Sequence, residues 1–407
     1  MGKYVIVGNG VAGVTAARAV VSADPAAEVH VYGAEPYPYY RRPLLWEFIA
    51  GQTEQDALYF RSPDWYAERS IHLHLGIEAV ELDTSAHRLA LTNGATVEYD
   101  RLLLATGGRP FVPPCQGMDK EGVFTLRTLE DALAIKAYVQ EASTAVVIGG
   151  GLLGLETARA LRTAGLEVTV VEFFPHLLPR QLDVEGAEVL QSLLEAQGLG
   201  IITGGTTEAI LGKGRADGIR LEDGRQVAGE LVLFSTGIRS QVTLAQTAGL
   251  EVNRGIVVDD HLQTNTQDVF AAGDIAEFGG QVYGIIPSAV EQARVAAANM
   301  VTPGSATYAG TLPATTLKFA GAELASLGEC LAEGDEYRPL RHVDLAAGCY
   351  RKLVLREGRI VGAILLNDKD RVRPTTQLIE RGVDVSAHAD HLLDDDLDLK
   401  SLLRETH

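Results

Sequence analysis

Two stretches of this chain repeat one pattern: a short apolar strand, a glycine-rich turn and the start of a helix. Residues 4–13 read Tyr-Val-Ile-Val-Gly-Asn-Gly-Val-Ala-Gly, and residues 145–154 read Ala-Val-Val-Ile-Gly-Gly-Gly-Leu-Leu-Gly. A helix and a second strand are predicted after each stretch, at residues 15–22 and 28–32 and at residues 155–164 and 167–171. Two such βαβ units predict an α/β fold with two Rossmann-like domains.

Both turns have the spacing Gly-x-Gly-x-x-Gly. The first glycine permits a tight turn, the second lets a pyrophosphate approach the backbone, and the third lets the helix pack on the strand. Such turns also occur for packing alone, but each one here lies in a complete βαβ unit. We therefore expect each unit to bind a dinucleotide, through Gly8, Gly10 and Gly13 in the first and Gly149, Gly151 and Gly154 in the second.

An acidic residue after the second strand of such a unit can accept hydrogen bonds from ribose hydroxyls. Glu172 directly follows that strand in the second unit, and two phenylalanines rather than an arginine come next. A 2′-phosphate would meet uncompensated negative charge there, so the sequence favours NADH over NADPH. A solvated glutamate at a strand end is the alternative. In the first unit Gly33 takes the equivalent place, and Glu35, two residues later, is a weaker candidate.

Three further segments, at residues 102–108, 231–237 and 264–274, end apolar strands with small or polar residues. An aspartate behind a glycine at such an end can point into a cleft and bind a polyol. Pro287 and the serine after it are typical of a helix start, whose positive end would suit an anionic ligand. The candidate residues in these segments are Ala105, Thr106, Gly107, Gly237, Gly273, Asp274 and Ser288.

The order of these motifs resembles the pyridine nucleotide–disulfide oxidoreductase superfamily of flavoproteins, over essentially the whole chain. Strings at residues 39–44, 177–183 and 316–321 are similar to NADH:rubredoxin reductases and to the flavoprotein half of NADH-dependent nitrite reductases. The resemblance implies that the first dinucleotide is FAD and the second NADH. It also implies that Asp274 binds the ribitol of FAD and that Arg42, Pro43 and Arg109 lie near its flavin or pyrophosphate.

Two residues would act at the flavin itself by the same resemblance. Lys318 would reach the N5/O4 edge, where a cation stabilises reduced flavin, unless it is only a surface lysine on a strand. Glu156 would flank the stacked flavin and nicotinamide, unless it is only a carboxylate on a helix surface. Trp46 could stack near the flavin, although a place in the core is favoured.

Cysteine is where the chain departs from the family pattern. Disulfide reductases and peroxidases of this superfamily carry reactive cysteines in the region that corresponds to residues 42–49, and this chain has none there. Its three cysteines, Cys115, Cys330 and Cys349, form no CxxC motif, so no iron–sulfur, zinc or dithiol site is predicted. His72 and His74 share a strand face without an evident third metal ligand.

We therefore expect a flavoprotein reductase that takes hydride from NADH and passes electrons to a small carrier, rubredoxin or ferredoxin. The alternatives are the flavoprotein component of a nitrite reductase with a haem partner, an NADH oxidase, and an NADH-sensing protein that resembles apoptosis-inducing factor. The formal net charge of −19 argues against nucleic-acid binding. Without a signal peptide or a membrane span, we expect a cytoplasmic monomer or homodimer.

Prolines and glycines near residues 110–114 and 237–240 predict the domain boundaries. We expect an FAD domain at residues 1–112 and 240–308, an NAD domain at 113–239, and a small C-terminal α+β domain at 309–407. Residues 338–373 hold nine Lys or Arg against four Asp or Glu. Arg351, Lys352, Arg356 and Arg359 could therefore form a docking patch for an acidic carrier, although a solvated hairpin is the favoured interpretation.

Overall fold

The computed structural model describes residues 2–319 and 322–404 and divides the chain into two compact units. Each unit combines segments that are distant in the sequence. The first unit consists of Met1–Leu45, Thr53–Pro110 and Ile238–Thr311. The second consists of Trp46–Gln52, Phe111–Gly237 and Leu312–His407.

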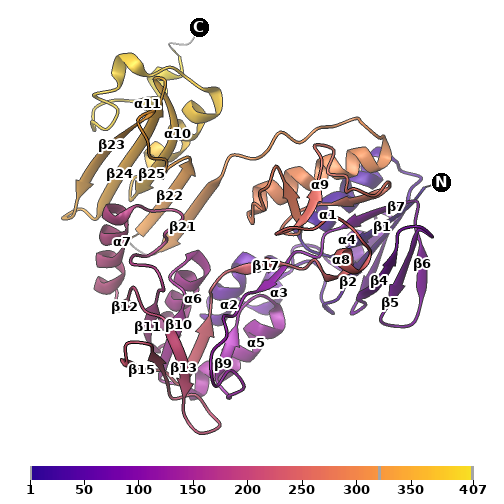
Figure 1. Cartoon of the computed structure of the whole chain (residues 1–407), viewed down its shortest axis with the longest axis horizontal. Helices are drawn as coiled ribbons and strands as arrows, with labels where there is room; N and C mark the ends of the chain where they lie inside the picture. The colour runs from indigo at the N-terminus through magenta and orange to yellow at the C-terminus, as the bar shows by residue number, and fades with distance from the viewer. Residues whose placement is uncertain (1, 320–321, 405–407) are drawn as a thin grey trace. The chain divides into compact units, whose positions relative to one another are not determined.

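A five-stranded parallel sheet organises the first unit (Figure 1). The strands at residues 3–7, 101–104 and 269–271 are buried on both faces, which explains their nearly continuous apolar sequences. The helices α1 (Val11–Ala23) and α9 (Ile286–Val301) pack against each other beside this sheet. The strand order is β19 (Val269–Ala271), β7 (Arg101–Leu104), β1 (Lys3–Val7), β2 (Glu28–Gly33) and β3 (Ile71–Leu75).

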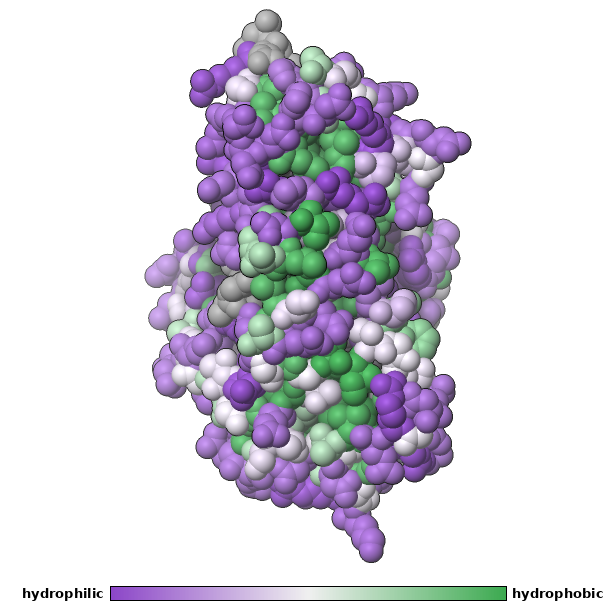
Figure 2. Space-filling view, turned by 90° about the vertical axis from the view of Figure 1, so that its left-hand side faces the viewer, coloured by the Kyte–Doolittle hydropathy of each residue, from purple (hydrophilic) through white to green (hydrophobic). Residues whose placement is uncertain are grey.

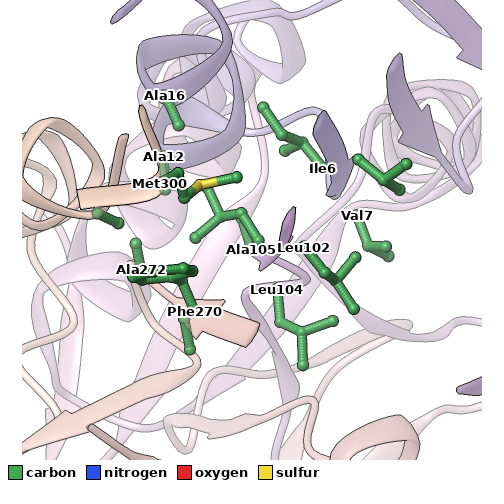
Figure 3. Close-up of a cluster of buried hydrophobic side chains, with 14 of the residues drawn as sticks. Ile6, Val7, Ala12, Ala16, Leu102, Leu104, Ala105, Phe270, Ala272 and Met300 are labelled. Atoms are coloured by element: carbon green, nitrogen blue, oxygen red, sulfur yellow. The ribbon is translucent and has the colours of Figure 1, made fainter. Parts of the chain in front are cut away.

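The core of this unit lies where α1 and α9 meet the sheet. Figure 3 shows Ala12 and Ala16 of α1 near Met300 of α9, with Phe270 of β19 and Ile6 of β1 in the same cluster. These side chains are at most 6% exposed. Alanines on the inner face let the helices approach closely, so the glycine turn after β1 is held in a rigid setting.

Shorter elements complete the first unit. An antiparallel sheet is formed by β4 (Ala79–Asp83), β5 (Arg88–Leu91) and β6 (Thr96–Glu98). Two strand pairs are formed by β8 (Gly108–Pro110) with β17 (Ile238–Ser240) and by β18 (Ile256–Val258) with β20 (Ala276–Phe278). The remaining helices are the 3-10 turn Arg42–Leu44, α3 (Gln55–Leu58), α4 (Pro63–Ala67) and α8 (Thr243–Thr247).

The second unit contains a second parallel sheet of five strands. Their order is β12 (Gly200–Ile202), β11 (Glu167–Val171), β10 (Thr144–Ile148), β16 (Leu231–Phe234) and β9 (Val123–Thr125). A small antiparallel sheet follows, with β13 (Thr207–Leu211), β14 (Gly218–Leu221) and β15 (Gln226–Ala228). The helices are α2 (Leu45–Ile49), α5 (Leu129–Tyr138), the 3-10 turn Val139–Glu141, α6 (Leu152–Thr163) and α7 (Val184–Ala196).

The C-terminal part of this unit is a five-stranded antiparallel sheet with short helices. Its order is β21 (Ala314–Phe319), β22 (Ala322–Gly328), β25 (Arg359–Leu366), β24 (Cys349–Arg356) and β23 (Tyr337–Asp344). The sequence pattern missed β23, because this edge strand is largely exposed and polar and contains Pro339. The helices are α10 (Lys369–Arg381), the 3-10 turn Ser386–His388 and α11 (Leu399–Leu402).

Helix starts differ from the expected positions. Both α1 and α6 begin directly after the second glycine of their turns, about one turn earlier than predicted, and Gly10 and Gly151 are their N-caps. Helix α10 begins at Lys369 and continues through Pro374. Hydrophilic residues predominate on the face shown in Figure 2. Among the described residues, no helix is long and apolar enough to cross a membrane.

Candidate nucleotide and flavin sites

The glycine turn of the first unit leaves little room for side chains at two of its three glycines. Gly8 has φ +117°, and a Cβ added there would lie 2.1 Å from the carbonyl oxygen of Ala105. A Cβ on Gly13 would lie 1.8 Å from the carbonyl oxygen of Gly8. At Gly10 a Cβ would meet only Nη1 of Arg42, at 3.5 Å. The turn is therefore closed toward the core and open at its second glycine, where a pyrophosphate would approach.

The turn of the second unit has the same geometry. Gly149 has φ +114°, and its added Cβ would lie 2.3 Å from the carbonyl oxygen of Ser235. A Cβ on Gly154 would lie 2.0 Å from the carbonyl oxygen of Gly149, whereas one on Gly151 would meet nothing within 4 Å. The N-terminus of α6 at this open glycine offers backbone N–H donors to a phosphate.

Glu35 and Arg42, both predicted to bind FAD, are paired with each other. Arg42 donates to Oε1 of Glu35, and the Tyr40 hydroxyl donates to Oε2 over 2.5 Å. Burial opposes the charged form of Arg42, but Tyr40, Glu35 and Asp274 outweigh it and raise its pKa. The guanidinium therefore stays charged beside the open glycine, as a partner for a pyrophosphate or a ribose requires.

The carboxyl ends of β1, β7 and β19 bring further predicted residues to one edge of the first sheet. Ala105, Thr106 and Gly107 follow β7, and Gly273 and Asp274 follow the adjacent β19. Ligands of open parallel sheets bind at such an edge.

Hydrogen bonds hold this edge in place. The hydroxyl of Thr106 donates to the carbonyl of Gln241 over 3.1 Å, and the N–H of Gly273 donates to Oε1 of Gln292 over 2.9 Å. The side chain of Gln292 is 1% exposed, and its Nε2 has no partner among the described residues. An unpaired buried donor in the helix behind Gly273 is consistent with a polar ligand at this edge.

Three predicted contacts in the first unit are less well placed. The Ser288 hydroxyl donates to the carbonyl of Ile285 over 2.9 Å, so it stabilises the start of α9. Pro43 is exposed in the 3-10 turn. Arg109 is exposed on β8, opposite Arg239 of β17. Contact of these three residues with FAD stays a prediction.

A pair that the sequence pattern did not reveal lies inside the first glycine turn. The hydroxyl of Tyr66 on α4 donates to Oδ1 of Asn9 over 2.8 Å. Burial raises the pKa of Tyr66, so its hydroxyl remains a donor. The Nδ2 of Asn9 is buried without a partner in the described part of the chain. The asparagine between the two glycines was a visible signal, but nothing in the sequence linked it to a residue 57 positions away.

Glu172 is buried against the second glycine turn. Its Oε2 accepts from the N–H of Gly150 over 2.5 Å, and its Oε1 accepts from the N–H of Phe174 over 2.9 Å. The alternative of a solvated glutamate is therefore wrong. The carboxylate is fixed beside the phosphate-binding turn, and its oxygens can accept further hydrogen bonds.

Gly237 follows the neighbouring β16. It has φ +100°, and a Cβ added to it would meet nothing within 4 Å.

Glu156 lies in the second turn of α6, close to Trp46 and Arg159. Burial raises the pKa of Glu156 to about 7, partly opposed by Arg159. The guanidinium of Arg159 lies 5.0 Å from the ring centre of Trp46, whose Nε1 is buried and unpartnered among the described residues.

Lys318, the other residue predicted to act at the flavin, is on β21, but its side chain lies outside the described part of the chain.

No group of described residues could hold a metal ion. The His72 and His74 pair predicted on one strand face is joined by His30, whose Nδ1 lies 3.0 Å from Nε2 of His74. Burial lowers the pKa of both His30 and His74. The ring of His30 stacks on the rings of His72 and His74, so the contacts within this group are ring contacts.

The predicted docking patch is wrong in its main members. Lys352 is 2% exposed, and its Nζ lies 3.0 Å from Oδ2 of Asp183. Arg351 is also largely buried and pairs with Asp368 and Asp395. Arg351 and Lys352 are consecutive on β24 and therefore face opposite sides of the sheet, and acidic partners from other segments meet both of them.

Two known sequence families together match most of the chain. The sequence pattern of the pyridine nucleotide-disulphide oxidoreductases matches residues 2–299, and that of the rubredoxin NAD⁺ reductase C-terminal domain matches residues 313–383. The chain belongs to the pyridine nucleotide-disulphide oxidoreductase family. Members of this family are NAD(P)H-dependent flavoprotein oxidoreductases, so binding of FAD and NAD(P)H follows from membership, and the two open glycine turns fit these groups.

Individual relatives differ in length. The chain is 38% identical to a nitrite reductase [NAD(P)H] of Bacillus subtilis (strain 168), over 95% of this chain but 48% of the relative. It spans about half the length of several such relatives. It is also 31% identical to the ferredoxin–NAD⁺ reductase component of a biphenyl dioxygenase system of Paraburkholderia xenovorans (strain LB400), over 98% of both chains.

Among solved structures, the putidaredoxin reductase in a covalent complex with putidaredoxin is similar to this chain. It has a TM-score of 0.89 and 28% identity, and the match covers 99% of this chain and 98% of the other. The similarity extends over both glycine turns and the C-terminal sheet. The predicted fold class, two Rossmann-like domains with a C-terminal α+β domain, is confirmed.

Proposed function

We propose that this chain transfers electrons from NADH through FAD to a small electron-carrier protein, rubredoxin or ferredoxin. Two open glycine turns support this proposal, because they provide separate places for the two dinucleotides. Bound FAD would supply the chemistry, accepting hydride from the nicotinamide and releasing electrons. The chain's own task is then to bind and orient both groups.

The residues divide this task between the units. Arg42 keeps a positive charge beside Gly10, and Asp274 offers a carboxylate at the same sheet edge for the ribitol. In the second unit the fixed Glu172 carboxylate would accept from ribose hydroxyls and repel a 2′-phosphate. A preference for NADH over NADPH is therefore part of the proposal.

The acceptor is inferred from the relatives and from cysteine placement. Residues 42–49 contain no cysteine, and Cys330 and Cys349 are buried. Burial also raises the pKa of both thiols, which makes them poor nucleophiles. Two of the similar proteins named above act with ferredoxin or putidaredoxin, which supports a protein acceptor.

A nitrite reductase component is the second candidate, because the relative with 38% identity is such an enzyme and is about twice as long as the match. Anaerobic addition of NADH to the FAD-loaded protein should bleach its visible flavin absorbance. Rubredoxin or ferredoxin should then restore the colour much faster than oxygen does. Fast turnover with oxygen alone would instead support an oxidase, and turnover only with a sirohaem protein would support the second candidate.

A further inference from the structure

The first unit contains a pocket that shares no residue with the predicted nucleotide site. Its volume is about 580 Å³, and its lining comes from α1 and from the segment that contains α4. Its lining includes Arg18 of α1 and, from the other side, Arg61, Trp65, Glu68 and Arg69. The glycine turn is at the opposite end of α1 from this pocket.

The charge of this pocket contrasts with that of the chain. Three guanidinium groups line it against a single carboxylate, whereas the chain carries a formal net charge of −19. Nη1 of Arg69 lies 3.4 Å from Oε2 of Glu68. Arg18 and Arg61 have no acidic partner in the described part of the chain. Two positive charges are thus left without compensation in one concave site, which favours an anion.

Stacking holds two of these arginines in place. The guanidinium carbons of Arg61 and Arg69 lie 5.0 Å and 4.6 Å from ring centres of Trp65, and that of Arg61 lies 4.0 Å from the ring centre of Phe60. Stacking occupies the faces of a guanidinium and leaves its N–H groups available in the plane. A cation fixed in this way loses little entropy when it binds a ligand.

An unused donor points to the same conclusion. Arg61 donates from Nη1 to the carbonyl of Phe60 over 3.0 Å, but its Nε is buried without a partner among the described residues. Buried donors are nearly always paired in folded proteins, by protein, water or ligand. Arg61 belongs to the lining of the pocket, so a ligand oxygen bound beside its guanidinium is a candidate partner for this N–H group.

We propose that this pocket binds the phosphate group of a small phosphorylated molecule, separately from FAD and NADH. Phosphate suits the site better than a single carboxylate, because it presents three acceptor oxygens and close to two negative charges to three guanidinium groups. The pocket is large enough for more than the phosphate alone. It would thus give the chain a second kind of ligand that does not take part in electron transfer.

Calorimetric titration of the FAD-loaded protein with inorganic pyrophosphate tests the proposal, with NAD⁺ at saturation so that the α6 turn is occupied. We expect saturable binding that Arg61→Gln and Arg18→Gln each weaken by about ten- to hundredfold, the usual effect of losing a charge-assisted hydrogen bond. Glu68→Gln should tighten binding, because it removes the only negative charge in the lining. A folding defect cannot produce that gain.

Arg88→Gln is the matched control, since Arg88 is an exposed arginine of the same unit that pairs with Glu98 outside the pocket. It should leave pyrophosphate affinity unchanged. An absence of saturable binding in the wild-type protein, or equal affinity in the Arg61→Gln and wild-type proteins, would overturn the proposal. NADH-dependent bleaching of the flavin is measured on the same samples, so a failure of electron transfer is recognised separately.

Discussion

Replacing Glu156 with glutamine should remove a pH-dependent loss of stability from the second unit. Burial raises the pKa of Glu156 from 4.5 to about 7, so folding favours its protonated form. The stability that this carboxyl contributes is fully present below pH 4.5 and is lost as the pH rises through 7. A shift of about 2.5 units at about 1.4 kcal/mol per unit makes the loss at most about 3.5 kcal/mol over the whole titration.

Glutamine has nearly the same shape but no proton to lose. We therefore expect Glu156→Gln to gain stability relative to the wild type between pH 5 and pH 8, by up to about 3 kcal/mol. Urea unfolding of the FAD-loaded proteins at a series of pH values measures this difference, and other titrating groups cancel from it. Glu130→Gln, at an exposed position on α5, is the control and should show no such trend.

The reasoning fails if the two unfolding curves of Glu156→Gln and wild type keep a constant separation from pH 5 to pH 8. That result would mean that water reaches the carboxyl in the folded protein and that folding does not destabilise its ionised form. A separation that grows at low pH instead would show a carboxylate stabilised by Arg159, the opposite sign of shift.

Further substitutions test separate parts of the structure. Glu172→Ala should narrow the ratio of kcat/KM for NADH over NADPH by about ten- to hundredfold, because it removes charge-assisted bonds worth about 1.5–3 kcal/mol. Gly151→Ala should fold normally but bind NADH more weakly, whereas Gly154→Ala should destabilise the second unit, since only its methyl group meets a carbonyl oxygen at 2.0 Å; thermal unfolding and NADH titration separate the two. Lys352→Met should cost about 3 kcal/mol in urea unfolding, because it removes the buried cation of Asp183 and leaves that carboxylate only Arg341 at 3.5 Å, and adding Asp183→Asn should recover part of that loss.

The sequence predicted most of what the backbone does at the nucleotide sites. The two glycine turns could be identified because their spacing, between an apolar strand and a helix, is a local pattern, and Glu172 could be placed because it directly follows a buried strand. Such patterns extend over about thirty residues, the length of one βαβ unit. Only Gly13 and Gly154 are crowded by their own turns, whereas the carbonyls of Ala105 and Ser235 that crowd Gly8 and Gly149 come from distant segments.

Features that depend on distant segments could not be predicted. Nothing near Asn9 in the sequence indicates that Tyr66 will donate a hydrogen bond to it. Nothing near Lys352 indicates that this lysine will be buried in an ion pair with Asp183. The basic residues of 338–373 could be counted in the sequence, but the burial of both faces of β24 could not be predicted. Period-two alternation places Arg351 and Lys352 on opposite faces, and only the packing partners decide whether one face or both are buried.

The burial of Lys352 also gives a physical role to the string at residues 177–183. Asp183 caps α7 by accepting from the N–H of Gly186 over 3.2 Å, and it also accepts from the hydroxyl of Tyr350 over 2.7 Å. Burial opposes its ionised form, but Tyr350, Lys352 and the Gly186 N–H outweigh that and lower its pKa. The Asp183 carboxylate thus binds the start of α7 and two residues of β24. It links the parallel sheet of the second unit to the C-terminal sheet, so substitutions of Asp183 should lower the stability of both sheets.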